Sequence, residues 1–309
     1  MPSTPYLLGI EIGGSKLQIV TGTREGTILD RQRMTAQRSQ GAEGIREQIK
    51  ATITRLRPQF QWEAVGVGYG GPVDWTTGRI CCSHHVEGWT DFALGDFLRE
   101  LTDLPVAVDN DSNTAAYGEA HRGAGAGFNP VFYTNSGSGI GGGLVVDGEI
   151  YHGATPGESE LGHVRLDKQG TILEDRCSGW AVDKKIRELS ALNPGSALTR
   201  LAAGKTGGEA RALGPALREN CPLAQQILNG TAEDLAFALS HAIHLFHPQA
   251  VVLGGGLALI GEPWREAVTT ALPRFVMHAF APGPQVRLAA LGEDAVPVGA
   301  LLLAAMARS

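Results

Sequence analysis

The chain carries the same pattern of strand, glycine-rich turn and strand twice. Residues 6–12 form a short apolar run, the glycine-rich turn 13–16 follows, and residues 17–21 are apolar again. The pattern returns at residues 131–147, around the glycine-rich turn 137–143. Short apolar runs bounded by glycine are typical of buried strands. Two such hairpins predict a fold of two similar halves that face one cleft.

Each glycine-rich turn can present a row of backbone N–H groups to an anion. In the first turn, the Ser15 hydroxyl and the Lys16 ammonium add further donors. The spacing is not that of a Walker loop, and a single turn of this kind is a weak indication. The two turns together predict a polyphosphate ligand. The phosphate-contacting residues that we expect are Gly13, Gly14, Ser15, Lys16, Gly137, Ser138 and Gly139.

A third glycine turn, formed by Gly254, Gly255 and Gly256, follows the apolar run 250–253 and precedes a helical pattern. A strand, a glycine turn and a helix in this order allow the close approach of a nucleotide. We therefore expect nucleotide binding at this turn.

Asp109, Asn110 and Asp111 come directly after the apolar run 106–108, and a run of small residues follows them. Carboxylates at the C-terminal edge of a strand lie where α/β proteins bind ligands. A carboxylate there can accept a proton from a substrate hydroxyl. The same triplet is also a good helix cap, because Asp and Asn are favoured at that position. The triplet alone leaves both interpretations open.

Strands alternate with helical patterns up to residue 108, which predicts an α/β domain. Residues 41–56 have helical spacing, with apolar residues recurring on one face. Further helices are expected at residues 92–101, 224–246 and 297–307, and the last of these can pack back on the first domain. A length of 309 residues favours two domains.

Glu160 and His163 are the polar residues of segment 153–163 that we expect to face a site. A histidine in such a place is also compatible with a simple core or surface role. We set a catalytic zinc aside, because the H-E-x-x-H spacing is absent and no cysteine lies near.

Composition excludes several classes of protein. The net charge is −6 and no basic block stands out, so nucleic acid is a poor partner. The four cysteines form no C-x-x-C pair, which argues against a zinc knuckle or a disulfide framework and agrees with a reducing cytoplasm. The apolar run 6–12 is too short for a leader or a membrane span. We expect a cytoplasmic protein without a membrane partner.

With these motifs in place, the chain resembles the ROK family of sugar kinases, within the actin/hexokinase-like superfamily. The resemblance covers nearly the whole length. The segments that carry it are GIEIGGSK at 9–16, GGPVD at 70–74, DND at 109–111, SGSGIGGG at 136–143, ELGH at 160–163, LE at 173–174 with SG at 178–179, and LGGG at 253–256. Six or seven motifs in the family's order make the match specific.

The resemblance implies a fold of two RNase H-like α/β domains around a central cleft. We expect the first domain at residues 1–118 plus 295–309 and the second at 119–294. It further implies ATP and Mg²⁺ as cofactors, a hexose or N-acetylhexosamine as the substrate, and a homodimer. Glucose, mannose, fructose and the N-acetylated hexosamines all stay open as substrates.

The family's motifs also imply roles for single residues. Asp111 matches the catalytic base, and Glu11 would hold Mg²⁺ directly or through water. The residues expected to bind the sugar are Ser83, Asn110, Asp111, Glu160, His163 and Glu174. The glycine turn 254–256 resembles the family's adenosine motif.

The chain departs from the family's pattern in three places. Glu11 and Ser15 stand where the family usually has Asp and Thr. The family's cysteine-rich zinc segment is missing, since residues 166–172 contain no cysteine, so we expect no structural zinc. HVEGW at residues 85–89 replaces a common Asn-Leu-x-Gly-Trp, which leaves the identity of the sugar open.

Alternatives to an ATP-dependent sugar kinase stay open, and these departures motivate the first of them. One is a catalytically silent sensor that binds sugar and nucleotide with the same fold. Another is a nucleotide-regulated assembly protein of the actin-like kind, and a third is a kinase that uses polyphosphate as its donor. A repressor with an N-terminal winged helix is disfavoured, because the first strand pattern begins at residue 6.

Overall fold

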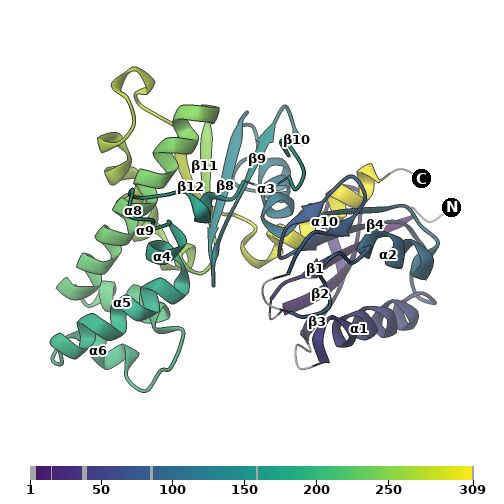
Figure 1. The fold of residues 1–309 in the computed structure, drawn as a ribbon, viewed down its shortest axis with the longest axis horizontal. Coiled ribbons are helices and arrows are strands. Elements are labelled where there is room, and N and C mark those ends of the chain that lie inside the picture. The colour runs from purple at the N-terminus through teal and green to yellow at the C-terminus, as the bar shows by residue number, and fades with distance from the viewer. Residues whose placement is uncertain (1–4, 15, 37–39, 84–85, 158, 308–309) are drawn as a thin grey trace. The chain divides into compact units, whose positions relative to one another are not determined.

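The computed structural model describes residues 5–14, 16–36, 40–83, 86–157 and 159–307 (Figure 1). The chain folds into two compact units. The first unit comprises Met1–Gly127, Gly143–Ser159 and Leu291–Ser309, and the second comprises Phe128–Gly142 and Glu160–Ala290. The domain division predicted from the sequence stays a prediction, and each unit is described by itself.

The first unit contains a five-stranded sheet in the order β3-β2-β1-β4-β7. β1, β2 and β3 are antiparallel neighbours, whereas β4 pairs parallel to β1 and β7 pairs parallel to β4. The strands are β1 (Tyr6–Ile12), β2 (Lys16–Gly22), β3 (Ile28–Thr35), β4 (Trp62–Tyr69) and β7 (Val106–Asn110), with a small pair β5 (Val73–Asp74) and β6 (Arg79–Ile80) beside them. β1 and β2 are buried over almost their whole length, as the apolar runs predicted.

Helices cover this sheet and complete its core. Ile45, Ile49, Ile53 and Leu56 of α1 are buried, as the helical spacing predicted. The helices of the first unit are α1 (Gly41–Leu56), α2 (Leu94–Thr102), α3 (Asp111–Arg122), the short 3-10 turn η7 (Gly292–Asp294) and α10 (Ala295–Met306). α10, drawn in yellow in Figure 1, packs against β1, β4 and α3, so the last helix belongs to the core of the first unit.

Glycines allow α10 to approach its neighbours at backbone distance. A Cβ atom on Gly66 of β4 would lie 1.9 Å from the carbonyl oxygen of Ala300, and one on Gly299 would lie 1.8 Å from the carbonyl oxygen of Thr114. No side chain fits at either position without moving a backbone. The absence of a side chain at Gly66 therefore allows α10 to pack closely against β4, and its absence at Gly299 allows α10 to pack closely against α3.

The second sheet has the order β10-β9-β8-β11-β12. β11 pairs parallel with both β8 and β12. The strands are β8 (Val131–Ser136), β9 (Ile140–Val146), β10 (Glu149–Ile150), β11 (Ala250–Gly254) and β12 (Gln285–Leu288). The predicted hairpin around the second glycine turn is therefore present as β8 and β9.

The second unit also holds most of the helices. The longest is α8 (Pro222–Phe246), which starts at a proline and ends before His247, a residue with a left-handed φ of 48°. The others are α4 (Glu174–Cys177), α5 (Gly179–Leu192), α6 (Ala197–Ala202), α7 (Leu213–Arg218) and α9 (Glu262–Ala271), with the 3-10 turns η2 (Leu161–His163), η3 (Glu209–Ala212), η4 (Leu257–Ile260), η5 (Leu272–Arg274) and η6 (His278–Phe280). Within the described ranges, no helix combines the length and the apolar character that crossing a membrane would require.

Candidate active site

The first glycine turn joins β1 to β2 and places Glu11 beside two donors. Gln18 Nε2 donates to Glu11 Oε2 over 2.6 Å, and Lys16 Nζ lies 3.1 Å from Glu11 Oε1. Glu11 is 9% exposed, and this burial raises the pKa of its carboxyl group, while the Lys16 charge opposes the rise. Arg33 Nε donates to Gln18 Oε1 over 3.1 Å, which turns the Gln18 amide so that its N–H group faces Glu11.

This arrangement can be tested against the expected Mg²⁺. Each oxygen of a carboxylate can accept more than one hydrogen bond. Lys16 and Gln18 take one position on each Glu11 oxygen, so positions remain that can accept from metal-bound water. The adjacent ammonium disfavours direct coordination. The Glu11 carboxylate therefore fits a hydrated Mg²⁺ held through water, whereas Ser15 of the same turn lies outside the described residues.

Within the DND triplet, Asn110 takes the helix-cap role that the sequence left open. Asn110, at the end of β7, caps α3: its Oδ1 accepts from the backbone N–H of Ser112 at 2.8 Å and of Asn113 at 3.2 Å. Its Nδ2 donates to the carbonyl oxygen of Gly71 over 3.1 Å. The cap interpretation is correct for Asn110. Asp111 becomes the first residue of α3, where the cap makes no demand on its side chain.

The Asp111 carboxylate lies close to Gly70, in the turn that follows β4. A Cβ atom on Gly70 would lie 3.2 Å from Asp111 Oδ2, a distance that few side chains tolerate. Ser112 Oγ lies 3.3 Å from Asp111 Oδ1. The parallel register of β4 and β7 sets this approach, because Tyr69 is paired with Asn110. The Asp111 carboxylate is thus positioned by strand register and by the absence of a side chain at Gly70.

Tyr69 was not predicted as a site residue, but the structure places it there. Its side chain is only 3% exposed, and burial raises the pKa of its hydroxyl to about 12. A hydrogen bond to Ser83 opposes the shift, and the charge of Asp111 adds to it. The predicted residues Ser83 and Asp111 therefore lie close to the Tyr69 hydroxyl. A strand end next to Gly70 was the only sequence signal for this role.

In the second unit, Glu160, His163 and Glu174 flank the base of one short hairpin, residues 164–173. Glu160 precedes the 3-10 turn η2, which carries His163 at its end, and both residues are exposed. The backbone N–H of Leu173 donates to the carbonyl oxygen of Val164 over 3.0 Å, so the residues that follow His163 pair with those that precede Glu174. The structure therefore joins the two predicted sugar-binding segments at the base of the hairpin 164–173.

A carboxylate organises the tip of this hairpin. Asp167 Oδ1 accepts from the backbone N–H groups of Gln169, Gly170 and Thr171 at 2.8, 2.9 and 3.1 Å. A hydrogen bond from the Thr171 side chain is the largest cause that lowers the pKa of the Asp167 carboxyl group, and the three backbone hydrogen bonds add to it. No group of three or more metal-ligating side chains occurs among the residues described, and the hairpin holds no cysteine. The residues present do not fit a zinc centre.

The three glycine segments of the second unit meet one another. The backbone N–H of Gly179 donates to the carbonyl oxygen of Gly137 over 2.7 Å. Gly255 has a left-handed φ of 79°, and a Cβ atom there would lie 2.5 Å from the backbone nitrogen of Ser136. The β8–β9 turn, the start of α5 and the turn after β11 therefore form one glycine-lined surface. Gly137, Ser138, Gly139 and the turn 254–256 belong to it, as a shared nucleotide site requires.

Comparison with known proteins supports a common architecture. A glucokinase of Halalkalibacterium halodurans is 28% identical over 96% of this chain and 94% of its own. A kanosamine kinase of Amycolatopsis mediterranei is 32% identical over 98% of this chain and 97% of its own.

A crystal structure of a ROK family glucokinase from Streptomyces griseus, in complex with glucose and AMPPNP, superposes with a TM-score of 0.84 at 28% identity, covering 98% of this chain and 99% of the other. This likeness confirms the predicted fold class, α/β with two sheet-and-helix halves. The sequence profile of the ROK family matches residues 7–307, and the chain belongs to that family.

Proposed function

We propose that the protein is an ATP-dependent sugar kinase that transfers the γ-phosphoryl group to a hydroxyl of a hexose or N-acetylhexosamine. The observation that carries the proposal is the division of labour at the start of α3. Asn110 satisfies the helix cap, so the cap does not require the Asp111 carboxylate, whose charge acts on the buried Tyr69 hydroxyl. Membership of the ROK family and relatives named as sugar kinases support the same conclusion.

Asp111 accepts the proton of the attacking hydroxyl. Phosphoryl transfer asks the protein mainly for positioning and for stabilisation of charge. The remaining sugar hydroxyls bind to Ser83, Asn110, Glu160, His163 and Glu174. Sites that hydrogen-bond each hydroxyl discriminate strongly among sugars, because a missing hydroxyl leaves a buried polar group without a partner.

The nucleotide binds along the glycine turns. Its phosphates contact the glycine-turn residues Gly13, Gly14, Ser15, Lys16, Gly137, Ser138 and Gly139, and its adenosine contacts the turn 254–256. Glu11 holds hydrated Mg²⁺ through water. When bound, Mg²⁺ neutralises part of the phosphate charge. We also propose that the protein is a homodimer, which light scattering after size-exclusion chromatography tests directly.

The test is a coupled assay of ADP release with Mg-ATP over glucose, mannose, fructose, kanosamine, N-acetylglucosamine and N-acetylmannosamine. ADP release with one or two of these sugars, insensitive to a zinc-selective chelator, is the expected result. Polyphosphate replaces ATP in a parallel series, with sugar phosphate as the readout. Absence of both sugar-dependent ADP release and sugar phosphate would overturn the proposal.

A second candidate function is a silent sensor that binds the same ligands. The pairing of Glu11 with Lys16 and Gln18 favours it, because the Lys16 ammonium disfavours direct coordination of Mg²⁺ by this carboxylate. A sensor would be stabilised against heat by sugar and by ATP and would release no ADP. Melting curves recorded beside the assay separate the two functions.

A further inference from the structure

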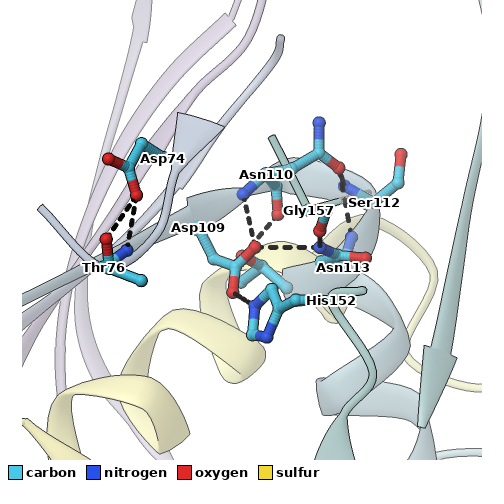
Figure 2. A network of polar contacts seen from close by, with 9 residues as sticks. Asp74, Thr76, Asp109, Asn110, Ser112, Asn113, His152 and Gly157 are labelled. Carbon is cyan, nitrogen blue, oxygen red and sulfur yellow. Dashed lines mark hydrogen bonds and ion pairs between the residues drawn. The ribbon is translucent and has the colours of Figure 1, made fainter. Parts of the chain in front are cut away.

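The Asp109 carboxylate is the centre of a buried polar network in the first unit (Figure 2). Asp109 is only 4% exposed. Its Oδ1 accepts from the backbone N–H of Asn110 at 2.8 Å and from Asn113 Nδ2 at 3.0 Å. Its Oδ2 lies 2.6 Å from His152 Nε2, which donates to it. Three donors thus fix both oxygens of this carboxylate.

The same network holds the segment that leads to Glu160. Asn113 Nδ2 also donates to the carbonyl oxygen of Gly157, over 2.6 Å. A Cβ atom on Gly157 would lie 2.7 Å from His152 Cβ, so the segment can close on itself only with glycine there. His152 and Gly157 therefore attach residues 152–157 at two points to the strand and helix that carry Asp109 and Asn113.

The network also reaches the turn between β5 and β6. The His152 ring stacks on Trp75 with ring centroids 4.1 Å apart and planes inclined by 13°. Trp75 follows Asp74, whose Oδ1 accepts from the backbone N–H and the hydroxyl of Thr76 at 3.0 and 2.6 Å (Figure 2). One imidazole thus contacts the ordered turn on one side and the Asp109 carboxylate on the other.

We propose that Asp109 and His152 are positioning residues for the Asn110–Asp111 pair; this inference rests on the proposed function. Asp109 is separated from Asp111 by one residue, so any displacement of its carboxylate moves the base. Reacting groups must be held closely, and a misplacement of about 1 Å can cost on the order of 100-fold in rate. Carboxylate–histidine pairs orient site residues in the same way around metals and nucleophiles.

His152 offers a cleaner test than Asp109, because removing the buried carboxylate would leave three donors without an acceptor. His152→Phe keeps the ring over Trp75 but loses the N–H group. His152→Gln loses the stack but places an N–H donor within reach of Asp109. The matched control is His121→Phe, since exposed His121 also makes one hydrogen bond, to the carbonyl oxygen of Gly148 at 2.9 Å, and also contacts an aromatic ring, that of Tyr117.

We expect His152→Phe to lower kcat by roughly 10- to 100-fold with the KM for ATP unchanged. We expect His152→Gln to restore kcat to within about threefold of wild type, and His121→Phe to match wild type. All variants are assayed well below their melting temperatures. Wild-type turnover in His152→Phe, or equal impairment of His152→Gln, would overturn the proposal.

Hydrogen exchange separates this inference from the proposed function. Peptides covering residues 106–113 and 150–157 are followed in the protein without ligands. Faster exchange in His152→Phe, but not in His121→Phe, supports the positioning role even if wild type releases no ADP. Unchanged exchange in both peptides contradicts it, whatever the activity.

Discussion

Glu174 Oε2 accepts a hydrogen bond from the backbone N–H of Ile140 over 2.8 Å. A Cβ atom on Gly139 would lie 2.5 Å from the same oxygen, so the carboxylate occupies space that a side chain would otherwise fill. Glu174, a proposed sugar-binding residue, is therefore in direct contact with the proposed phosphate-binding turn 137–139 within the second unit. A substitution of Glu174 must therefore also alter the position of this turn.

The first prediction uses this contact. Glu174→Gln keeps an oxygen that can accept from Ile140, whereas Glu174→Ala loses it. Hydrogen bonds to charged groups contribute about 1.5–3 kcal/mol, so we expect Glu174→Ala to raise the KM for sugar by roughly 10- to 100-fold. We also expect it to raise the KM for ATP, and Glu174→Gln to do so less. An unchanged KM for both substrates in the alanine variant would show that Glu174 binds neither the sugar nor the phosphate-binding turn in a way that matters for catalysis.

The second prediction concerns the proposed base. Asp111→Asn keeps the size of the side chain and removes its basicity, so turnover should fall by roughly 10²–10⁴-fold. Sugar binding, measured by calorimetry, should survive. Equal turnover in mutant and wild type would exclude Asp111 as the base.

The third prediction concerns the hairpin 164–173. Asp167→Ala removes the acceptor of three backbone N–H groups, while Asp167→Asn keeps an oxygen in place. We expect the alanine variant to bind sugar more weakly, because the hairpin base carries His163 and Glu174, and the asparagine variant to stay close to wild type. Sugar titration by calorimetry measures both.

The same carboxylate gives a pH dependence. The pKa of Asp167 is lowered below 3.8 by its hydrogen bonds, so the ionised form supports the hairpin above that pH. This support is lost as the pH falls through the lowered pKa. The amide resonances of Gly170 and Thr171 should therefore shift with a midpoint below 3.8 in wild type and not at all in Asp167→Asn. A midpoint above 3.8 would contradict the assignment.

The fourth prediction concerns Tyr69. Its pKa is raised from 10 to about 12, so the protonated form stabilises the fold fully below pH 10, and this contribution is lost between pH 10 and 12. A shift of two units corresponds to about 2 to 3 kcal/mol. We expect the unfolding free energy of wild type to fall more steeply than that of Tyr69→Phe over this window. Tyr151→Phe, at an exposed tyrosine, should follow wild type.

The fifth prediction compares two glycines that both have a positive φ angle. Gly255 and Gly261 have φ values of 79° and 86°, but only a Cβ atom on Gly255 meets the backbone of Ser136, whereas one on Gly261 meets nothing within 4 Å. Both alanine variants carry backbone strain of about 1–3 kcal/mol, because a positive φ is unfavourable for an L-residue. Gly255→Ala should in addition weaken ATP binding by at least about tenfold, since β8 must move. Equal ATP affinity in the two variants would remove the turn 254–256 from the proposed nucleotide site.

Local patterns were enough to predict most of the fold. The apolar runs became β1, β2, β8 and β11, and the apolar helical face at residues 45–56 became the buried face of α1. The approach of Gln18 to Glu11 was also within reach of the sequence. A hairpin centred on residues 14 and 15 places these two residues opposite each other, as the register of β1 and β2 shows.

The roles of Tyr69, His152 and Asp167 could not be predicted from local pattern. Tyr69 reaches the site only because β4 pairs with β7 in one particular register. His152 meets Asp109 across 43 residues of chain, and no local period encodes that contact. Asp and Asn have similar cap preferences, so only the backbone direction at the end of β7 assigns the cap to Asn110. Which sugar hydroxyls the proposed ligands contact stays a prediction.

The packing of α10 in the first unit has a consequence for folding during synthesis. The ribosome delivers residues 1–127 before the second unit, but the helix that closes over Gly66 comes from residues 295–306, which follow the second unit in the chain. The first unit is thus the first to be synthesised and the last to be completed. Without α10, the face of its sheet that this helix covers lacks its packing partner while the second unit is synthesised. A chain interrupted after residue 290 would hold a complete second unit and an unfinished first one, a substrate for chaperones and proteases. Closure of the first unit therefore requires that the whole second unit has already been synthesised.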